Sequence, residues 1–207
     1  MKLIIFGSTG TIGQHLVTQA LAQGHEVTAF ARRPERIEIT HNNLTRISGD
    51  VLDPDSVKAG IEGHDAVIIA LGAGRNGGIR AIGTTHIIDA MKKLGLRRLI
   101  CQSTLGVGDS HQNLNFLWKY IMFGILLRPA FADHVAQEAA IKQSHLDWII
   151  VRAGAFTDGP ATGAYKHGFS PDEKNLQLKI SRADVAGFIL QQLTHDNYLH
   201  KAPGLSN

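Results

Sequence analysis

Short apolar runs alternate with amphipathic stretches over nearly the whole chain. The first run, Leu3-Ile4-Ile5-Phe6, is continuous and ends at a glycine, a pattern typical of a strand buried on both faces of a parallel sheet. In the stretch that follows, the apolar residues fall on one helical face, and Gly24 stands where such a helix would stop. The chain is therefore predicted to begin with a strand, a glycine turn and a helix.

The same alternation predicts the rest of the fold. Apolar runs indicate strands over 26–31, 44–48, 65–70, 98–102 and 148–151, and amphipathic stretches indicate helices over 54–61, 79–94 and 132–144. Strands that alternate with helices form parallel βαβ units, whose right-handed crossovers build a doubly wound sheet. With 207 residues, the chain is long enough for one well-buried domain and short for two. We therefore expect a single α/β domain over residues 1–207 with a mostly parallel sheet.

The C-terminal part departs from this pattern. Residues 176–180 alternate between apolar and polar like a half-exposed edge strand, and Ser181-Arg182-Ala183-Asp184 resembles a capping box that opens a helix over 185–193. We expect this piece to pack at the edge of the sheet and to help wall a site, with Asp184 in a capping role.

Charge and cysteine content narrow the classes of partner. The formal net charge is +3, and no long run of Lys and Arg is present that would follow a nucleic-acid backbone, so small anionic ligands fit better than nucleic acid. The single cysteine, Cys101, allows no intramolecular disulfide. The apolar run after Lys2 is too short for a signal peptide, and no apolar stretch reaches the roughly 18 residues of a membrane span. These features predict a cytoplasmic protein with no membrane span.

Three glycines, Gly7, Gly10 and Gly13, follow the first strand directly and open the first helix. Glycine lets the backbone turn sharply and approach a pyrophosphate, which the N–H groups and dipole of a helix N-terminus stabilise. A tight turn without a ligand is the alternative, but the strand before the turn and the helix after it are the context that a dinucleotide motif requires. We expect the cofactor to contact Gly7, Thr9, Gly10, Thr11, Ile12 and Gly13.

The end of the second strand predicts which dinucleotide is bound. NAD-binding proteins place an Asp or Glu about 20 residues after the turn, where it binds the ribose 2′-hydroxyl. This chain has Arg32 and Arg33 there, and guanidinium groups attract a 2′-phosphate that an acid would repel. An exposed basic loop is the alternative, yet the pair favours NADP(H). Ligands of open α/β sheets bind at the ends of the strands, so we add Asp50, Val51, Leu71, Gly72 and Arg75 to the cofactor site.

Several motifs carry a resemblance to a known family over nearly the whole chain, at 5–10, 26–32, 49–51, 65–72 and 162–165. On these motifs the chain resembles the atypical short-chain dehydrogenase/reductases, in particular the flavin reductase and biliverdin reductase B branch. The resemblance implies a Rossmann fold and a nicotinamide beside the fifth strand, with Ser103 near the reacting ring. That hydroxyl would bind the carboxamide or a substrate oxygen, or it would only cap backbone groups. By position, Thr104, Ala153 and Phe156 would also contact the cofactor.

Two departures from the family pattern bear on the chemistry. The Tyr-x-x-x-Lys pair of ordinary short-chain dehydrogenases is missing from the helix that begins at Ala132, and Ala155 stands where the biliverdin reductase B branch commonly has a histidine. Alcohol and ketone interconversion and a tetrapyrrole substrate are therefore disfavoured. Reduction of a flavin or a quinone fits better, because hydride can pass to such an acceptor when the cofactor is simply positioned and protons come from solvent.

Two further features are candidates for chemistry. His134 has Asp133 and Glu138 nearby and could donate a proton over the cofactor, or it could be an ordinary helix histidine. The apolar segment 116–127 could stack on a flat substrate ring, although burial in the core or in a homodimer interface is the more common role of such a helix. No histidine or cysteine spacing indicates a metal site.

The sequence thus supports two functions of different class. The first is an NADPH-dependent reductase that passes hydride to a flavin, a quinone or a similar planar acceptor. The second is a regulatory protein similar to the NmrA type, which keeps the dinucleotide fold, senses NADP(H) and has lost its chemistry. The absent Tyr and Lys pair is compatible with both.

Overall fold

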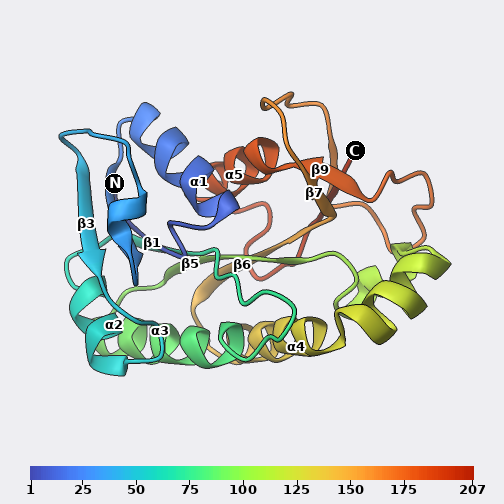
Figure 1. Cartoon of the computed structure of the whole chain (residues 1–207), viewed down its shortest axis with the longest axis horizontal. Helices are drawn as coiled ribbons and strands as arrows, with labels where there is room; N and C mark the ends of the chain where they lie inside the picture. Colours follow the sequence, from blue (N-terminus) through green and yellow to red (C-terminus); the bar gives the residue numbers. More distant parts are fainter.

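A mostly parallel sheet of eight strands forms the middle layer of the computed structural model, which describes residues 1–207 (Figure 1). The strand order is β3-β2-β1-β4-β5-β6-β10-β8, and all neighbours pair in parallel except β10 and β8. The strands are β1 (Lys2–Phe6), β2 (Glu26–Ala31), β3 (Leu44–Ser48), β4 (Ala66–Ile69), β5 (Arg98–Thr104), β6 (Asp147–Ala153), β8 (Lys166–His167) and β10 (Gly204–Ser206). The first six strands have the order of a doubly wound Rossmann sheet, which confirms the predicted fold class.

Helices cover both faces of the sheet. On one face lie α1 (Thr11–Ala22) and α5 (Arg182–Gln191), and on the other lie α2 (Pro54–Ile61), α3 (Arg80–Leu94) and α4 (Arg128–Lys142) (Figure 1). Side chains of β1 alternate between the two faces: Leu3 and Ile5 belong to the core under α1 and α5, whereas Ile4 and Phe6 belong to the core on the other side. This double burial explains why β1 is a continuous apolar run.

The C-terminal part differs from the prediction. The edge of the main sheet is formed by β10 and β8, while the expected edge strand over 176–180 is replaced by the shorter β9 (Lys179–Ser181), which pairs in parallel with β7 (Ala155–Thr157) in a separate sheet. Leu178 has a φ of 57°, in the left-handed region, so the extended backbone starts only after it. The Ser181 cap is confirmed, because the Asp184 backbone N–H donates to the Ser181 hydroxyl at 3.0 Å and α5 begins at Arg182. The Asp184 carboxylate does not complete a capping box and instead accepts from the backbone N–H groups of Thr162 and Gly163 at 2.8 and 2.9 Å.

Three short helical segments complete the chain: η1 (Pro34–Arg36), η2 (Gly108–Asn113) and the π-helical η3 (Leu117–Leu126). The last of these projects from the end of the sheet, where it appears as the yellow-green coil in Figure 1, and α4 follows it directly. A π-helix of this length is rare and is often associated with functional sites. None of the helices is both long and apolar enough to span a bilayer.

Candidate functional site

The glycine turn packs tightly between β1, β4 and the start of α1. Gly7 has a φ of 83°, and a Cβ added there would overlap the carbonyl oxygen of Ala70. A Cβ on Gly13 would likewise overlap the carbonyl oxygen of Gly7, so these two glycines hold the turn against the sheet. Gly10 is the N-cap of α1, with no side-chain cap and no acidic residue in the first turn. The N–H groups at this helix end are therefore available to an anion.

One cavity lies on the β2 and β3 side of the turn and has a volume of about 240 Å³. Arg32 lines it, as predicted, and so does Arg36, which was not predicted from the sequence. Arg33 is exposed and does not line it. The remaining predicted residues that line this cavity are Gly7, Thr9, Gly10, Asp50, Val51, Leu71 and Gly72.

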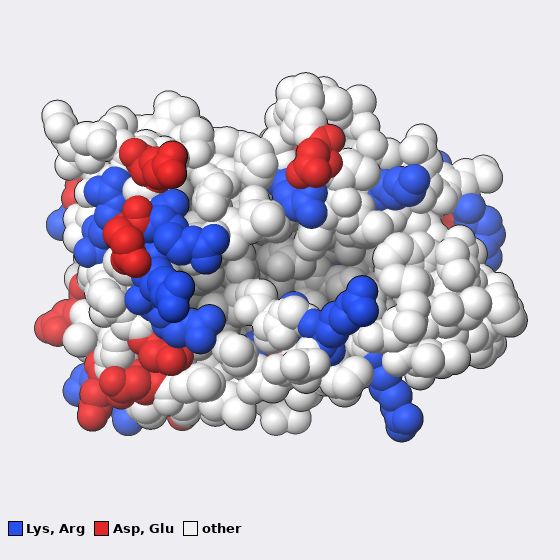
Figure 2. Space-filling model, viewed as in Figure 1, with Lys and Arg blue, Asp and Glu red and all other residues white.

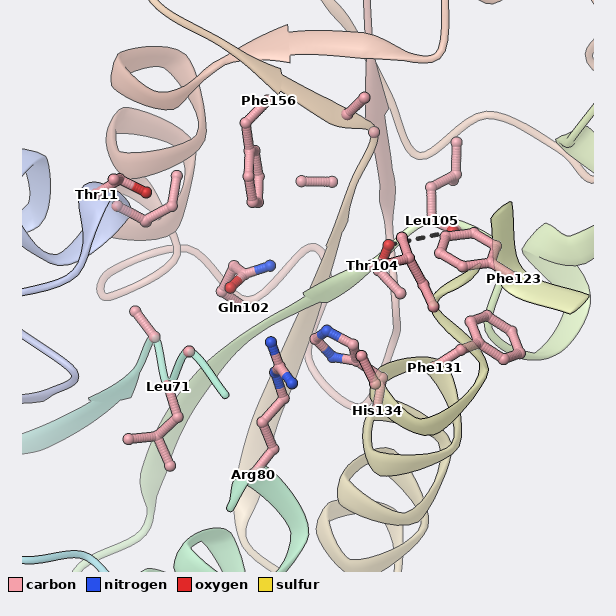
Figure 3. A pocket seen from close by; sticks show the side chains of 18 of the residues that line it. Thr11, Leu71, Arg80, Gln102, Thr104, Leu105, Phe123, Phe131, His134 and Phe156 are labelled. Carbon is pink, nitrogen blue, oxygen red and sulfur yellow. Dashed lines mark hydrogen bonds between the residues drawn. The ribbon is translucent and has the colours of Figure 1, made fainter. Parts of the chain in front are cut away.

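A larger cavity of about 400 Å³ runs from the turn, past the ends of β4, β5 and β6, to η3 and α4 (Figure 3). Predicted residues that line it are Gly10, Thr11, Ile12, Leu71, Gly72, Thr104, His134, Ala153 and Phe156. In the space-filling view a hollow opens in the middle of the face, with Lys and Arg side chains gathered on one side and a largely uncharged lobe on the other (Figure 2). The cleft therefore joins a cationic end to an apolar end.

The wall opposite the turn is aromatic and aliphatic. Trp118 and Phe123 of η3 and Phe131 of α4 line it, and the Phe123 and Phe131 rings stack with centroids 4.6 Å apart. Phe156 lies across the cavity from them (Figure 3). The outer side of η3 is exposed instead, since Phe116 and Ile125 each keep 71% of their surface accessible. The segment 116–127 is thus part of the cavity wall on one side and uncovered on the other.

The strand β5 turns alternate side chains toward the cavity. Gln102 and Thr104 line it, whereas Ser103 points to the opposite face, where its hydroxyl donates to Glu138 Oε1 at 2.8 Å. Ser103 is fully buried in this position. The expectation that its hydroxyl lies beside the reacting ring is therefore not met, because the parity of the strand places Gln102 and Thr104 there.

His134 lines the cavity from α4 and is 8% exposed. Burial, together with the nearby charge of Arg80, lowers the pKa of His134 from 6.5 to about 4 against the opposing effects of Asp133 and Glu138. The imidazole is consequently neutral near pH 7 and a weak proton donor, which argues against the acid role predicted from the sequence. Its Nδ1 is buried and has no hydrogen-bond partner.

Several outcomes differ from the sequence predictions. Four predicted residues line neither cavity: Gly13, Arg33, Arg75 and Ser103. Four polar residues of the cleft were missed: Arg36, Arg80, Gln102 and Arg182. Arg36 follows the predicted arginine pair closely enough that the local charge pattern could have included it, and strand alternation could have placed Gln102 on the same face as Thr104. Arg80 and Arg182 owe their positions to long-range packing. No group of three or more His, Cys, Asp or Glu side chains could hold a metal ion.

The glycine turn, the free end of α1 and the two cavities on either side of them define a dinucleotide-binding Rossmann protein. The chain belongs to the NAD(P)H-binding family whose model matches residues 7–196. The turn and its uncapped helix end fit such a cofactor. Among curated proteins, it is 27% identical over 217 residues to the uncharacterized sugar epimerase YhfK of Bacillus subtilis, covering 98% of this chain and 92% of YhfK.

Solved structures show the same fold. The anaerobilin reductase ChuY from Escherichia coli superposes with a TM-score of 0.83 at 24% identity, covering 100% of this chain and 97% of ChuY. A short-chain dehydrogenase/reductase from Veillonella parvula, solved in complex with NADP, gives a TM-score of 0.85 at 19% identity over 100% of this chain and 94% of that one. The protein is thus an NAD(P)H-binding protein with a fold that reductases also use.

Proposed function

We propose that the protein is an NADPH-dependent reductase that transfers hydride to a flavin, a quinone or a similar planar acceptor. The observation that carries the proposal is the larger cavity: the residues of the cofactor turn, Gly10 to Ile12, and the aromatic wall of Phe123, Phe131 and Phe156 line the same space. A ring held against that wall would lie in the same enclosure as the end of a bound dinucleotide.

Bound NAD(P)H supplies a hydride, which is a proton with two electrons, and the acceptor takes its remaining proton from water. The role of the chain's own residues is to bind and position the acceptor. The aromatic and aliphatic wall excludes water from the acceptor face, and Thr104 and Gln102 present polar groups at the floor. No residue with an ordinary acid function faces the cavity, since His134 is neutral near pH 7. Acceptors that need only positioning therefore fit this site better than alcohols or ketones.

The direct test follows the nicotinamide absorbance band with NADPH and NADH offered separately against free flavins, quinones and a linear tetrapyrrole. Oxidation of NADPH with a flavin or quinone is the expected result. Turnover with the tetrapyrrole alone would show that the acceptor is a tetrapyrrole and not a flavin or quinone. Binding of NADPH without turnover of any acceptor would overturn the reductase proposal and favour the sensing role, for which the next experiment is the NADP(H) dependence of partner capture.

The preference for NADPH over NADH is part of the proposal and rests on Arg32. Arg32 lines the smaller cavity and its neighbour Arg33 does not, so a substitution at Arg33 is a control for the same substitution at Arg32. A charged hydrogen bond to the 2′-phosphate contributes about 1.5–3 kcal/mol, so Arg32→Glu should weaken NADPH binding about tenfold or more and spare NADH. Arg33→Glu should change NADPH binding much less. Equal losses in the two variants, measured by fluorescence titration, would show that only the general charge of the loop matters.

A further inference from the structure

Arg80 is a buried cation that is ion-paired with Asp133 but makes no hydrogen bond through its Nε or Nη1. It opens α3, lines the larger cavity and is only 9% exposed. Its Nε and Nη1 atoms are buried and have no hydrogen-bond partner. The nearest acid, Asp133, lies 3.5 Å from Nη1, beyond ordinary hydrogen-bond distance. The carboxylate of Asp133 instead accepts hydrogen bonds from the backbone N–H groups of Arg80 and Ala81, at 3.1 and 3.0 Å.

His134 stands next to Arg80 and is unpartnered in the same way. Figure 3 shows the guanidinium and the imidazole reaching the same part of the cavity, below Gln102. Arg80 and His134 keep only 9% and 8% of their residue surface exposed, and His134 Nδ1 also lacks a partner. Buried polar groups in native proteins nearly always have partners, because leaving them unpaired costs free energy. Two such groups at one wall of a cavity indicate a ligand that completes them.

The charge of the cavity indicates what kind of group that ligand carries. No Asp or Glu lines the larger cavity, and its two lining arginines are Arg80 and Arg182. The Arg182 side chain already donates to Asp158 at 2.7 Å and lies over the Phe156 ring at 5.6 Å. Asp133, which pairs with Arg80 at 3.5 Å, does not itself line the cavity, so the charged side chains in the cavity wall are both arginines. A planar fork of guanidinium donors matches a carboxylate.

We propose that Arg80 and His134, here called the Arg80–His134 corner, bind a carboxylate carried by the acceptor, so that the preferred substrates are planar aromatic or conjugated carboxylates. That the carboxylate belongs to a hydride acceptor rests on the proposed function. Binding of a carboxylate at the corner does not require turnover. The carboxylate would accept from the part of the guanidinium that faces the cavity and anchor one edge of the ring. The opposite edge would then lie against the aromatic wall of Phe123 and Phe131.

The test compares two isosteric probes, naphthoate and naphthamide, binding to the full chain saturated with NADP⁺, by isothermal titration calorimetry. We expect naphthoate to bind about tenfold more tightly or better, since a charge-assisted forked contact is stronger than a neutral one. Equal binding of the two probes to the unmodified protein would overturn the proposal, and this arm requires no variant to fold. Because no hydride transfer is involved, the result is independent of whether any acceptor is reduced.

Two arginine variants locate the effect. Arg80→Gln should abolish the preference for naphthoate while the Kd for NADP⁺ stays within about twofold, and Arg182→Gln, the other lining arginine, should keep the preference. A loss of NADP⁺ affinity in Arg80→Gln equal to its loss of naphthoate affinity would assign the guanidinium to the cofactor and overturn the proposal. Loss of the preference in Arg182→Gln alone would also overturn it.

Discussion

Two buried arginines near the same cavity differ in how fully they are paired. Arg152 in β6 is 2% exposed and donates to both oxygens of Glu138, from Nε at 3.0 Å and from Nη2 at 2.8 Å, and its Nη1 pairs with Asp109. Arg80 is buried almost as well, yet two of its nitrogens have no partner. The two arginines therefore differ in how fully they are hydrogen-bonded and hardly at all in burial.

The saturated arginine belongs to a network that ties β6 to α4. Glu138 accepts from Ser103 at 2.8 Å and from Lys142 at 3.0 Å in addition to Arg152. Burial alone would raise the pKa of Glu138, but the hydrogen bond and charge of Arg152, with the charge of Lys142, hold it below its ordinary value. Each partner in this network stabilises the others, and none of these four residues lines the larger cavity.

The largest expected effect follows from breaking this network. Arg152→Met should lower the free energy of unfolding by about 3–5 kcal/mol, because it leaves Glu138 buried without its main partner. Urea denaturation followed by tryptophan fluorescence measures the change. Arg80→Gln is the comparison variant and should cost less, since its ion pair with Asp133 is long at 3.5 Å and Asp133 keeps its two backbone donors.

A second substitution sharpens the same test. Arg152→Met combined with Glu138→Leu should recover much of the lost stability, because no uncompensated charge then remains buried. Equal costs for the single Arg152 and Arg80 variants would show that the degree of pairing does not distinguish the two arginines, and the comparison would fail.

The next largest effect is on the pH dependence of stability, which differs between His134 and Glu138. His134 has a pKa of about 4 in the folded protein against an ordinary value of 6.5, so between these values the unfolded chain binds the extra proton. Stability from this group is therefore complete above about pH 6.5 and falls as the pH drops toward 4, by about 3 kcal/mol for a shift of this size. Glu138 has a lowered pKa, so its contribution is present above about pH 4.5 and is lost only below that.

Denaturation curves across this pH range check the assignment. The variant His134→Gln carries no titrating group and should flatten the decline between pH 6.5 and 4 while leaving the loss at lower pH. An unchanged slope in that variant would mean that the imidazole is not buried and neutral, which would also weaken the Arg80–His134 corner.

The glycine turn and part of the larger cavity, including Phe156 and His134, were predicted from the sequence, whereas Arg80 was not. The glycine turn is a local pattern of residues three apart between a strand and a helix, and the fold class follows from the periodicity of apolar positions. The position of Arg80 depends on contacts that no local pattern records. Arg80 meets Asp133 across 53 positions of sequence, and the two lie side by side only because α3 and α4 pack together on one face of the sheet.

The misplacement of Ser103 has a simple geometric reason. The apolar run predicted a fifth strand over 98–102, but β5 continues to Thr104, so side-chain alternation carries through the whole segment. In a strand, the choice of face changes with every residue, and a position next to the site has as much chance of pointing away as toward it. The family resemblance located the segment correctly beside the cavity without fixing which of its side chains enters it.

The smallest effect tests the exposed edge of the saturated network. Lys142 is 41% exposed and lies one helical turn from Glu138, which it contacts at 3.0 Å, so Lys142→Met should lower the free energy of unfolding by only about 0.3–0.5 kcal/mol. Added salt should shrink that difference further, because an accessible pair is screened, while the cost of Arg152→Met should persist. Urea denaturation at low and high salt makes both measurements. A loss from Lys142→Met as large as that from Arg152→Met would mean that the network depends on its exposed member, and that solvent reaches the carboxylate which the structure buries.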